Sequence, residues 1–544
     1  MIADMSYSKN QPDTVTRLVV PKRVATAKNA ENTETLLRDN PRQALIFGSI
    51  EYCTVHCGGY VVLDMGCELH GGVDITLEKM QPVESVIRVT FGESVMEALS
   101  TLGVKNAGNE HATRDFTYRS KGAASIKLGD TGYRFVKIEA VERDVYIKTV
   151  QGSFKYRDLE YRGSFECNDE RINRIWSIGA YTVHLNMQDY LWDGIKRDRL
   201  VWIGDVNPEL LTICSVFGDC DVVPKSLDLI MNTTPIGQWM NTLPSYTSWW
   251  VINQKAWYMQ NGDRKYLAER AGYLFDTLKQ IIGCVSEDGR LDYPSYFCDW
   301  SSNETPDESI GAYSVTIMGL RAGAYLCRCL DNGELAEDCD ACAERLLGKR
   351  LNETSNKQMG ALYAMAGGVG YREISDRLLL KEGAHGLSTF LGGYVLRAIA
   401  SAGYMEQAID IMRLYWGAML DLGATTFWED FDMDWITERT VGIDKVVPEG
   451  MLDVHGDFGK FCYTRFRHSL CHGWASGPTS FLSQTVTGIE ILEPGCRRVR
   501  IAPELGGLEY IRTKYPTPHG VIEVEAERGH APRIVLPEGV ELVK

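Results

Sequence analysis

The chain has 544 residues, of which 44% are apolar and 10% aromatic, and its formal charge is −16. This length exceeds what one hydrophobic core fills, so we expect several domains. The negative charge and the absence of long basic runs exclude nucleic acid and anionic membranes as expected partners.

Targeting and membrane segments are not expected. The sequence begins without the apolar stretch of a secretory signal peptide and contains no run of 18 apolar residues. Fifteen cysteines, scattered from Cys53 to Cys496, favour free thiols in a reducing cytoplasm. Cys339 and Cys342 form a lone C-x-x-C pair, and without a second pair at zinc spacing we expect no metal there.

Residues 1–165 are predicted to form an N-terminal β-sandwich. Short β-branched runs with alternating polarity are separated by Gly, Asp and Asn turns, as in strands of such folds. The runs are residues 58–66, 71–80, 85–93, 134–141 and 144–152.

Residues 166–484 have a helical pattern instead. Ile172, Ile175 and Trp176 recur at helical spacing, and Asn168 is the expected N-cap of that helix. Other clear helical segments are residues 263–285, 310–330, 333–351 and 405–423. About a dozen helices paired by short turns predict an (α/α)6 toroid, or barrel, whose long loops at one end carry function.

Residues 485–544 return to alternating β runs and predict a small C-terminal β-domain, again a sandwich. The predicted fold class is therefore multidomain α+β, with a central helical domain between two β-domains.

The stretch "DGIKRDRLVWIGD", residues 193–205, is predicted to be a loop between two helices. Asn207 and Pro208 suit the N-cap and first position of the following helix. A loop of this kind presents its side chains to a cleft.

Three carboxylates in this loop cannot all be equally acidic. Neighbouring carboxylates raise the pKa of one group, whereas Arg197 or Lys196 lowers that of another, which gives one site both an acid and a fixed anion. Trp202 would exclude water. The alternative is a surface loop of salt bridges.

A second stretch, "GATTFWEDFDMDW" (residues 423–435), places Glu429 beside the indole of Trp428 after a tight turn. A carboxylate here could face Asp198 across the toroid, which is the arrangement of an inverting glycosidase. The alternatives are an acidic loop or a calcium site, but no Gly or Glu stands at EF-hand spacing. The calcium ligands would be Asp430, Asp432 and Asp434.

In "RHSLCHGWASGPTSFL", residues 467–482, His468 and His472 are four residues apart. The Glu of the zinc motif H-E-x-x-H is missing, and Cys471 only weakly suggests a thiol nucleophile. We expect His472 to bond a ligand hydroxyl or carboxylate, with simple packing as the alternative.

Together these stretches resemble the catalytic domain of glycoside hydrolase family 78, the α-L-rhamnosidases. The family's acid motif D-x3-R-E-R-x2-W-x-G-D matches residues 193–205, and its G-A-T-T-x-W-E motif is intact at residues 423–429. The family's following histidine matches His472. "YRGSFECNDERINRIW", residues 161–176, looks like the start of the family's barrel. The resemblance covers residues 161–485 well and agrees with the flanking β-domains.

The resemblance implies an inverting exo-glycosidase that releases terminal α-L-rhamnose from a small glycoside or oligosaccharide. By position, Asp198 would be the general acid and Glu429 the general base on water, with no cofactor or metal. The implied sugar-binding residues are Asp193, Arg197, Trp202, Asp205, Trp249, Trp250, Asp299, Trp300, Trp428 and His472.

One departure affects the acid. The family's residue is usually Glu, and the shorter Asp198 withdraws the carboxyl, which leaves Glu209 as a rival donor. A helix N-terminus lowers a carboxylate's pKa, which argues against Glu209.

Three other functions stay open: a same-fold glycosidase of other specificity, a polysaccharide lyase and a catalytically weak sugar-binding homologue. Monomer and homodimer also stay open.

Overall fold

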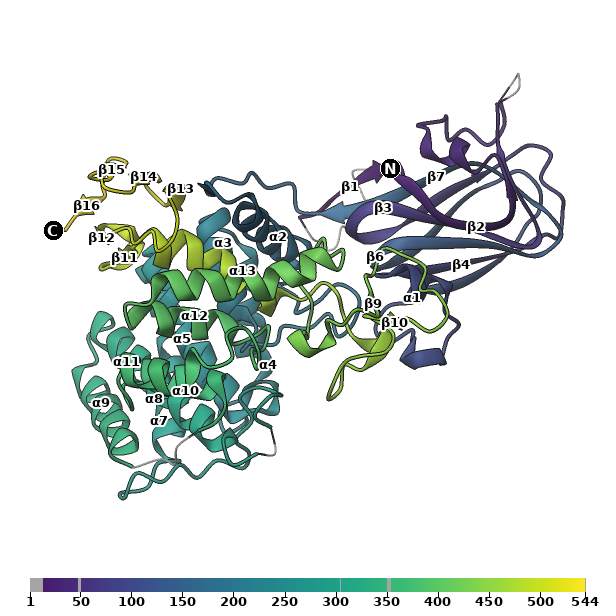
Figure 1. Ribbon diagram of the computed structural model, residues 1–544. Helices are drawn as coiled ribbons and strands as arrows, with labels where there is room; N and C mark the ends of the chain where they lie inside the picture. The colour runs from purple at the N-terminus through teal and green to yellow at the C-terminus, as the bar shows by residue number, and fades with distance from the viewer. Residues whose placement is uncertain (1–12, 47–49, 304, 350–353, 544) are drawn as a thin grey trace, which may run out of the picture.

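A computed structural model describes residues 13–46, 50–303, 305–349 and 354–543. Figure 1 shows a β-rich lobe at the N-terminal end, a helical lobe beside it, and the C-terminal strands on the outer side of the helices. Within the described ranges, no helix is both long and apolar enough to cross a membrane.

The N-terminal lobe is built on one seven-stranded, hydrogen-bonded sheet in the order β1-β7-β3-β6-β4-β5, with β2 paired to β3. Register shifts bend the long strands, for example between Gly71 and Gly72 of β3, so that the strands curve around one apolar core. A short helix, α1 (Val95–Leu99), follows β4. The strands are β1 (Val15–Val19), β2 (Arg23–Glu31), β3 (Cys53–Leu77), β4 (Val86–Gly92), β5 (Asp115–Arg119), β6 (Ser125–Glu142) and β7 (Val145–Tyr156).

Helices dominate from residue 170 to 480. The first, α2, contacts α13 and α14 near the end of the region, so the two ends of the helical lobe meet. The helices are α2 (Glu170–Asn186), α3 (Val206–Val216), α4 (Val222–Thr233), α5 (Pro244–Asn261), α6 (Arg264–Glu269), α7 (Ala271–Ile282), α8 (Glu308–Cys329), α9 (Gly333–Gly348), α10 (Lys357–Met365), α11 (Tyr371–Ile374), α12 (Gly392–Ser401), α13 (Met405–Asp421) and α14 (Gly477–Ser480).

Two helix starts differ from the sequence predictions. Asp169, not Asn168, caps α2: its carboxylate accepts a hydrogen bond from the Arg171 N–H, while Asn168 accepts one from the Glu509 N–H. Helix α3 begins at Val206, so Asn207 lies inside its first turn. There the Asn207 side chain bonds Asn253, which satisfies the amide without a capping role.

The C-terminal strands form two small sheets. One has the order β11-β12-β16 and the other β15-β14-β13-β8. Strand β8 (Ser164–Cys167) precedes α2, so the predicted boundary after residue 165 runs through a strand of the C-terminal sheet. The other strands are β11 (Ile489–Ile491), β12 (Arg498–Ile501), β13 (Tyr510–Thr517), β14 (Gly520–Glu527), β15 (Arg533–Val535) and β16 (Glu541–Leu542).

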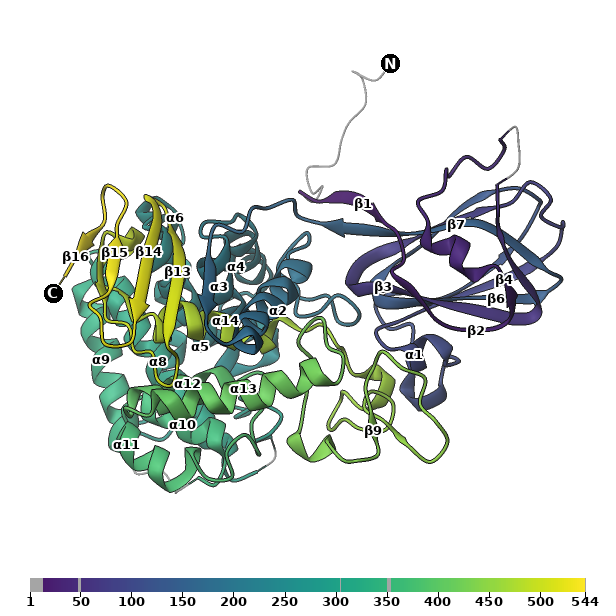
Figure 2. The ribbon, with the colours of Figure 1, turned by 45° about the horizontal axis from the view of Figure 1, so that its top comes forward.

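A long connection between α13 and α14 lies between the two lobes. It carries the short strands β9 (Thr440–Val441) and β10 (Leu452–Asp453), and Figure 2 shows it in green beside α1. The Val95 N–H of α1 donates to the Ile443 carbonyl at 2.9 Å. This connection therefore joins the β-lobe to loops that lead into the helical lobe.

Candidate active site

The acid loop, residues 193–205, is a loop between α2 and α3, as its sequence predicts. It folds back on itself because the Asp193 carboxylate accepts the Leu200 N–H at 2.9 Å. The Asn186 side chain, at the end of α2, donates to the Asp193 carbonyl at 3.1 Å. These two bonds fix the start of the loop against α2.

Asp198 stands in a left-handed turn together with Arg199, at φ values of 56° and 55°. Its backbone N–H donates to Nδ1 of His111 at 2.8 Å, and its Oδ1 lies 3.4 Å from the same nitrogen. Oδ1 is also 3.8 Å from Nε of Arg197. The Asp198 side chain keeps 19% of its surface exposed, which places this carboxyl at the outer part of the site.

Glu429 follows α13 and a turn at Gly423, whose φ of 95° favours glycine. The Ser469 N–H donates to its Oε2 at 3.1 Å, and Nη2 of Arg197 donates to its Oε1. The Glu429 side chain is only 3% exposed. Arg197 thus lies between the deep carboxylate Glu429 and the outer carboxylate Asp198.

His472 lies on the floor of the site among acidic groups. Its Nε2 is 3.6 Å from Asp193, 3.9 Å from Glu429 and 4.0 Å from Asp205. Burial nevertheless lowers the pKa of His472 to about 4, so the ring is neutral near pH 7. A neutral imidazole can donate or accept a hydrogen bond with a sugar hydroxyl.

Two carboxyl groups on this floor, those of Asp193 and Asp205, are weaker acids than usual. Burial raises the pKa of Asp193 well above its usual range, and the charge of Asp198 raises it further. Burial and the charge of Asp193 also raise the pKa of Asp205 well above its usual range. Oδ1 of Asp205 accepts a hydrogen bond from the Tyr246 hydroxyl at 3.2 Å. A carboxyl group with a raised pKa binds a proton more readily, and in its protonated form it can donate as well as accept hydrogen bonds.

These groups line one pocket of about 700 Å³, within the usual size of a small-molecule site. Six predicted site residues of the acid loop and base motif line this pocket, together with the predicted His472 and Trp300. Three aromatic residues of its wall, Tyr246, Phe297 and Trp474, were not predicted. The lining is Asp193, Arg197, Asp198, Trp202, Asp205, Asn241, Thr242, Leu243, Tyr246, Phe297, Trp300, Glu429, Cys462, His472 and Trp474.

Four predicted sugar-binding residues lie elsewhere. Trp249 and Trp250 are buried in α5, where Trp249 packs against Tyr394 and Trp250 donates to the Leu227 carbonyl. Trp428 is buried against Phe431. Asp299 lines an adjacent cavity, and its carboxylate accepts the Ser388 hydroxyl at 2.7 Å.

Glu209 is fully buried in the first turn of α3 and does not line the pocket. Burial raises its pKa well above the usual range, so desolvation outweighs the helix N-terminus, which was expected to lower it. The carboxyl packs directly under Gly473. The geometry therefore favours Asp198 over Glu209 as the group that meets a ligand.

The three aspartates considered for calcium have separate partners. The carboxylate of Asp432 pairs with Lys460 at 2.6 Å and that of Asp434 with His385 at 2.9 Å, whereas Asp430 contacts His468 through its backbone N–H. Two of the three carboxylates, those of Asp432 and Asp434, therefore have separate basic partners.

Two carboxylates at different depths of an aromatic pocket, carried on loops of a helical lobe, form an arrangement that glycoside hydrolases use. The family described as bacterial alpha-L-rhamnosidase 6 hairpin glycosidase domain matches residues 160–335. The family described as bacterial alpha-L-rhamnosidase C-terminal domain matches residues 488–541. Residues 160–335 and 488–541 are thus similar to two domains of bacterial α-L-rhamnosidases.

The chain is also similar to curated relatives and, in its fold, to solved structures. The alpha-L-rhamnosidase of Streptomyces avermitilis is 23% identical over 506 residues, which are 85% of this chain and 46% of that protein. The family 78 rhamnosidase structure of Bacillus sp. GL1 has a TM-score of 0.73 at 20% identity, covering 93% of this chain and 55% of its own. The Klebsiella oxytoca rhamnosidase structure with rhamnose bound has a TM-score of 0.69 at 19% identity. The match covers 87% of this chain and 96% of that one. The chain spans less than half the length of the Streptomyces relative.

Proposed function

We propose that this chain is an inverting exo-glycosidase that releases terminal α-L-rhamnose, with Asp198 as general acid and Glu429 as general base. The observation that carries the proposal is the meeting of the two motifs, which are distant in sequence, on either side of Arg197. One carboxyl that protonates the leaving oxygen and another that activates water are the two parts of the inverting mechanism.

The different depths of the two carboxyls support these roles. Asp198 is partly exposed, where a leaving group would depart toward solvent, and Glu429 is buried, where a water beneath the sugar would sit. The Arg197 guanidinium pairs with Glu429 and holds its carboxylate at the pocket. Asp193, Asp205 and His472 would hold the sugar hydroxyls.

The shape of the pocket supports action on a terminal sugar. Its floor is formed by buried polar groups, and its walls by aromatic rings, on which the apolar face of a sugar can pack. The Klebsiella rhamnosidase structure has rhamnose bound, and a deoxy sugar with a methyl group suits apolar walls.

We further infer that the helical lobe is a closed (α/α)6 barrel. The contacts of α2 with α13 and α14 support closure, because they join the first helix of the region to the last. The acid loop and base motif then project from the same end of this barrel into the pocket.

A reducing compartment such as the cytoplasm is part of the proposal. All fifteen cysteines lie in described ranges and are unpaired there. We expect thiol reductants to leave activity unchanged.

Turnover of p-nitrophenyl α-L-rhamnoside tests the function. We expect the wild type to cleave it, and D198N and E429Q to lose on the order of 10³-fold in kcat with folding intact. Proton NMR of the first product should show the β-anomer, as inversion requires. Retention of configuration, or wild-type activity in D198N, would contradict the assigned mechanism.

A same-fold glycosidase of another specificity is the second candidate, because Asp198 replaces the usual Glu of the family. A shorter acid reaches a differently placed glycosidic oxygen, and misplacement of about 1 Å can cost roughly 100-fold in rate. A panel of p-nitrophenyl glycosides separates the candidates. Cleavage of another sugar with no turnover of the rhamnoside would favour this one.

A further inference from the structure

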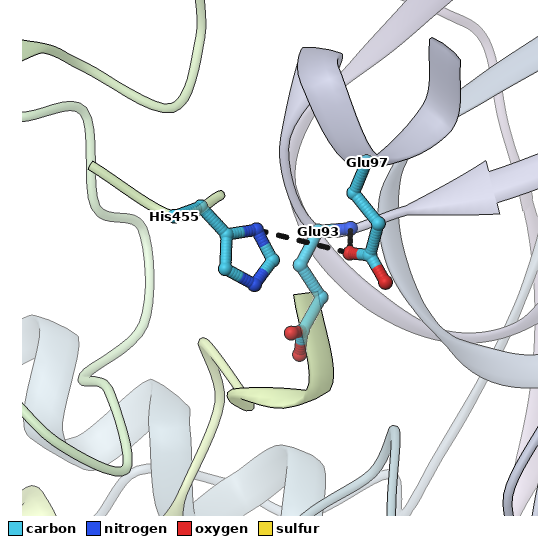
Figure 3. Close-up of side chains that lie close together, drawn as sticks. All are labelled: Glu93, Glu97 and His455. Atoms are coloured by element: carbon cyan, nitrogen blue, oxygen red, sulfur yellow. Dashed lines mark hydrogen bonds and ion pairs between the residues drawn. The ribbon is translucent and has the colours of Figure 1, made fainter. Parts of the chain in front are cut away.

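A buried charged cluster lies at the boundary between the lobes, beside the site. Figure 3 shows three side chains close together: Glu93, directly after β4, Glu97, in α1, and His455, in the long connection. The two glutamate side chains are at most 1% exposed. Among the described residues, these three form a group whose geometry could hold a metal ion.

The cluster already contains cations. Nζ of Lys196 lies 3.1 Å from Glu93 and 3.0 Å from Glu97, and Nε of Arg114 lies 3.6 Å from Glu97. Two cations therefore face two carboxylates, which offsets the cost of burying those charges.

The ring of His455 is also occupied. Its Nδ1 bonds the Ser94 hydroxyl at 2.8 Å, and its Nε2 bonds the His468 carbonyl at 2.9 Å. A bound metal would have to displace Lys196 and break one of these bonds.

Lys196 connects the cluster to the acid loop and to the loop before His472. It immediately precedes Arg197 and stands two residues before Asp198. Its Nζ also donates to the carbonyls of Phe466 and His468, both at 2.8 Å. One ammonium thus joins both loops to the β-lobe.

Glu93 also contacts the segment that holds Glu429, the proposed base. Its Oε2 accepts the Leu470 N–H at 2.7 Å, and the preceding residue, Ser469, donates its own N–H to Glu429. The Ser469 carbonyl in turn accepts the Glu429 N–H at 2.9 Å. A displacement of Glu93 would therefore move the backbone that holds Glu429.

We propose that Glu93 and Glu97 of the β-lobe, acting through Lys196, are positioning residues that set the separation of Asp198 and Glu429. None of the three lines the substrate pocket. The inference rests on the proposed function, because it assigns the two carboxyls their roles. It makes the β-lobe a part of the catalytic machinery.

Kinetics of K196M and E93Q test this positioning role. We expect kcat to fall by about 10- to 100-fold, since misplacement on the order of 1 Å has such an effect, while KM changes less than about threefold. K196R, which keeps the charge, should recover part of the loss in kcat. The matched control is K105M, which removes a 2.6 Å ion pair between Lys105 and Asp457 at the same lobe boundary and keeps Lys196 with its two glutamate partners. K105M should keep wild-type kcat.

A second measurement keeps the test independent of activity. Amide hydrogen exchange should be faster in K196M than in the wild type in residues 195–200 and 467–472, and unchanged elsewhere. K105M should exchange at the wild-type rate in both segments. Wild-type kcat and exchange in K196M would overturn the positioning role. So would loss of wild-type activity in a chelator with recovery on adding Mn²⁺ or Zn²⁺, because the cluster would then be a metal site. If the wild type cleaves no glycoside but exchange changes as expected, the proposed function fails and the structural link stands.

Discussion

His472 is a neutral base on a floor of carboxyl groups, and its neutrality couples the stability of the fold to pH. The ring resists protonation because burial removes water, and nearby Arg197 adds to this effect on the pKa. His472 therefore binds a proton less readily in the native state than in the unfolded chain, where its pKa is near the usual 6.5.

The sign of this effect is testable. His472 contributes nothing to the pH dependence above about pH 6.5, and it destabilises the fold as the pH falls from there toward its native pKa of about 4. Between pH 7 and pH 5 we expect H472N to lose roughly 2 kcal/mol less of its unfolding free energy than the wild type. Urea denaturation at the two pH values measures this difference, and parallel changes in both proteins would contradict it.

Asp198 combines an unusual residue with an unusual backbone. Aspartate tolerates the left-handed region better than most side chains, so the turn at residues 198–199 suits it. The bond from its N–H to His111 holds this turn from the β-lobe. The motif around Asp198 could be found in the sequence. Its partner His111 could not, because it lies in the other lobe and no sequence motif marks it.

At the scale of elements, the start of α3 packs under the segment that follows His472. A Cβ atom at Gly473 would lie 1.6 Å from Oε1 of Glu209, so a larger residue there would force the buried Glu209 side chain to move. The buried Glu209 carboxyl therefore fixes how closely the helix and this segment approach, although it does not reach the pocket.

The contact predicts a coupled pair of substitutions. We expect G473A to cost about 1–3 kcal/mol of unfolding free energy and to lower kcat, because overpacking shifts His472 and Trp474. In G473A/E209A the obstructing carboxyl is gone, so the combined loss should be smaller than the sum of the two single losses. Chemical denaturation of the four proteins of the cycle measures this coupling. Strict additivity would show that the two groups do not meet.

The sequence predicted where the two loops and several of the helices lie, but not which side chains of those helices line the pocket. The acid loop and the turn before Glu429 follow from local signals, namely charge beside an indole and glycine before small residues. Trp249 and Trp250 were predicted to bind sugar but are buried in α5. In the sequence, an aromatic pair that packs inside the protein looks the same as one that lines a pocket. Tyr246, one helical turn before Trp250, gave no distinguishing signal either, and only the packing of α5 separates them.

At the scale of the whole molecule, buried charges tie the two lobes together. Arg134 of β6 donates to both oxygens of Asp64 at 2.8 and 2.9 Å and also to the Gly423 carbonyl, in the turn before the base. Arg23 pairs with the same Asp64 at 2.9 Å. Removing one member of such a group leaves the others buried and unpaired.

We therefore expect the two lobes to unfold in one calorimetric transition. D64N should lower the unfolding free energy by roughly 3–5 kcal/mol, because it leaves Arg134 without its buried partner. D158N is the control, since Asp158 pairs with Arg17 at the surface and should contribute less than about 1 kcal/mol. Two separate transitions in the wild type, or equal effects of the two substitutions, would contradict this view.

The placement of β8 has a consequence for how the chain is made. Residues 164–167 leave the ribosome long before their partner β13, residues 511–514, with the whole helical region between them. Until then, β8 is a bare sheet edge, able to pair with other chains. Closure of the sheet therefore has to follow synthesis of the helices, as a late, long-range event. A ribosome that stalls before residue 511 would release a chain with its helices complete and this edge unprotected.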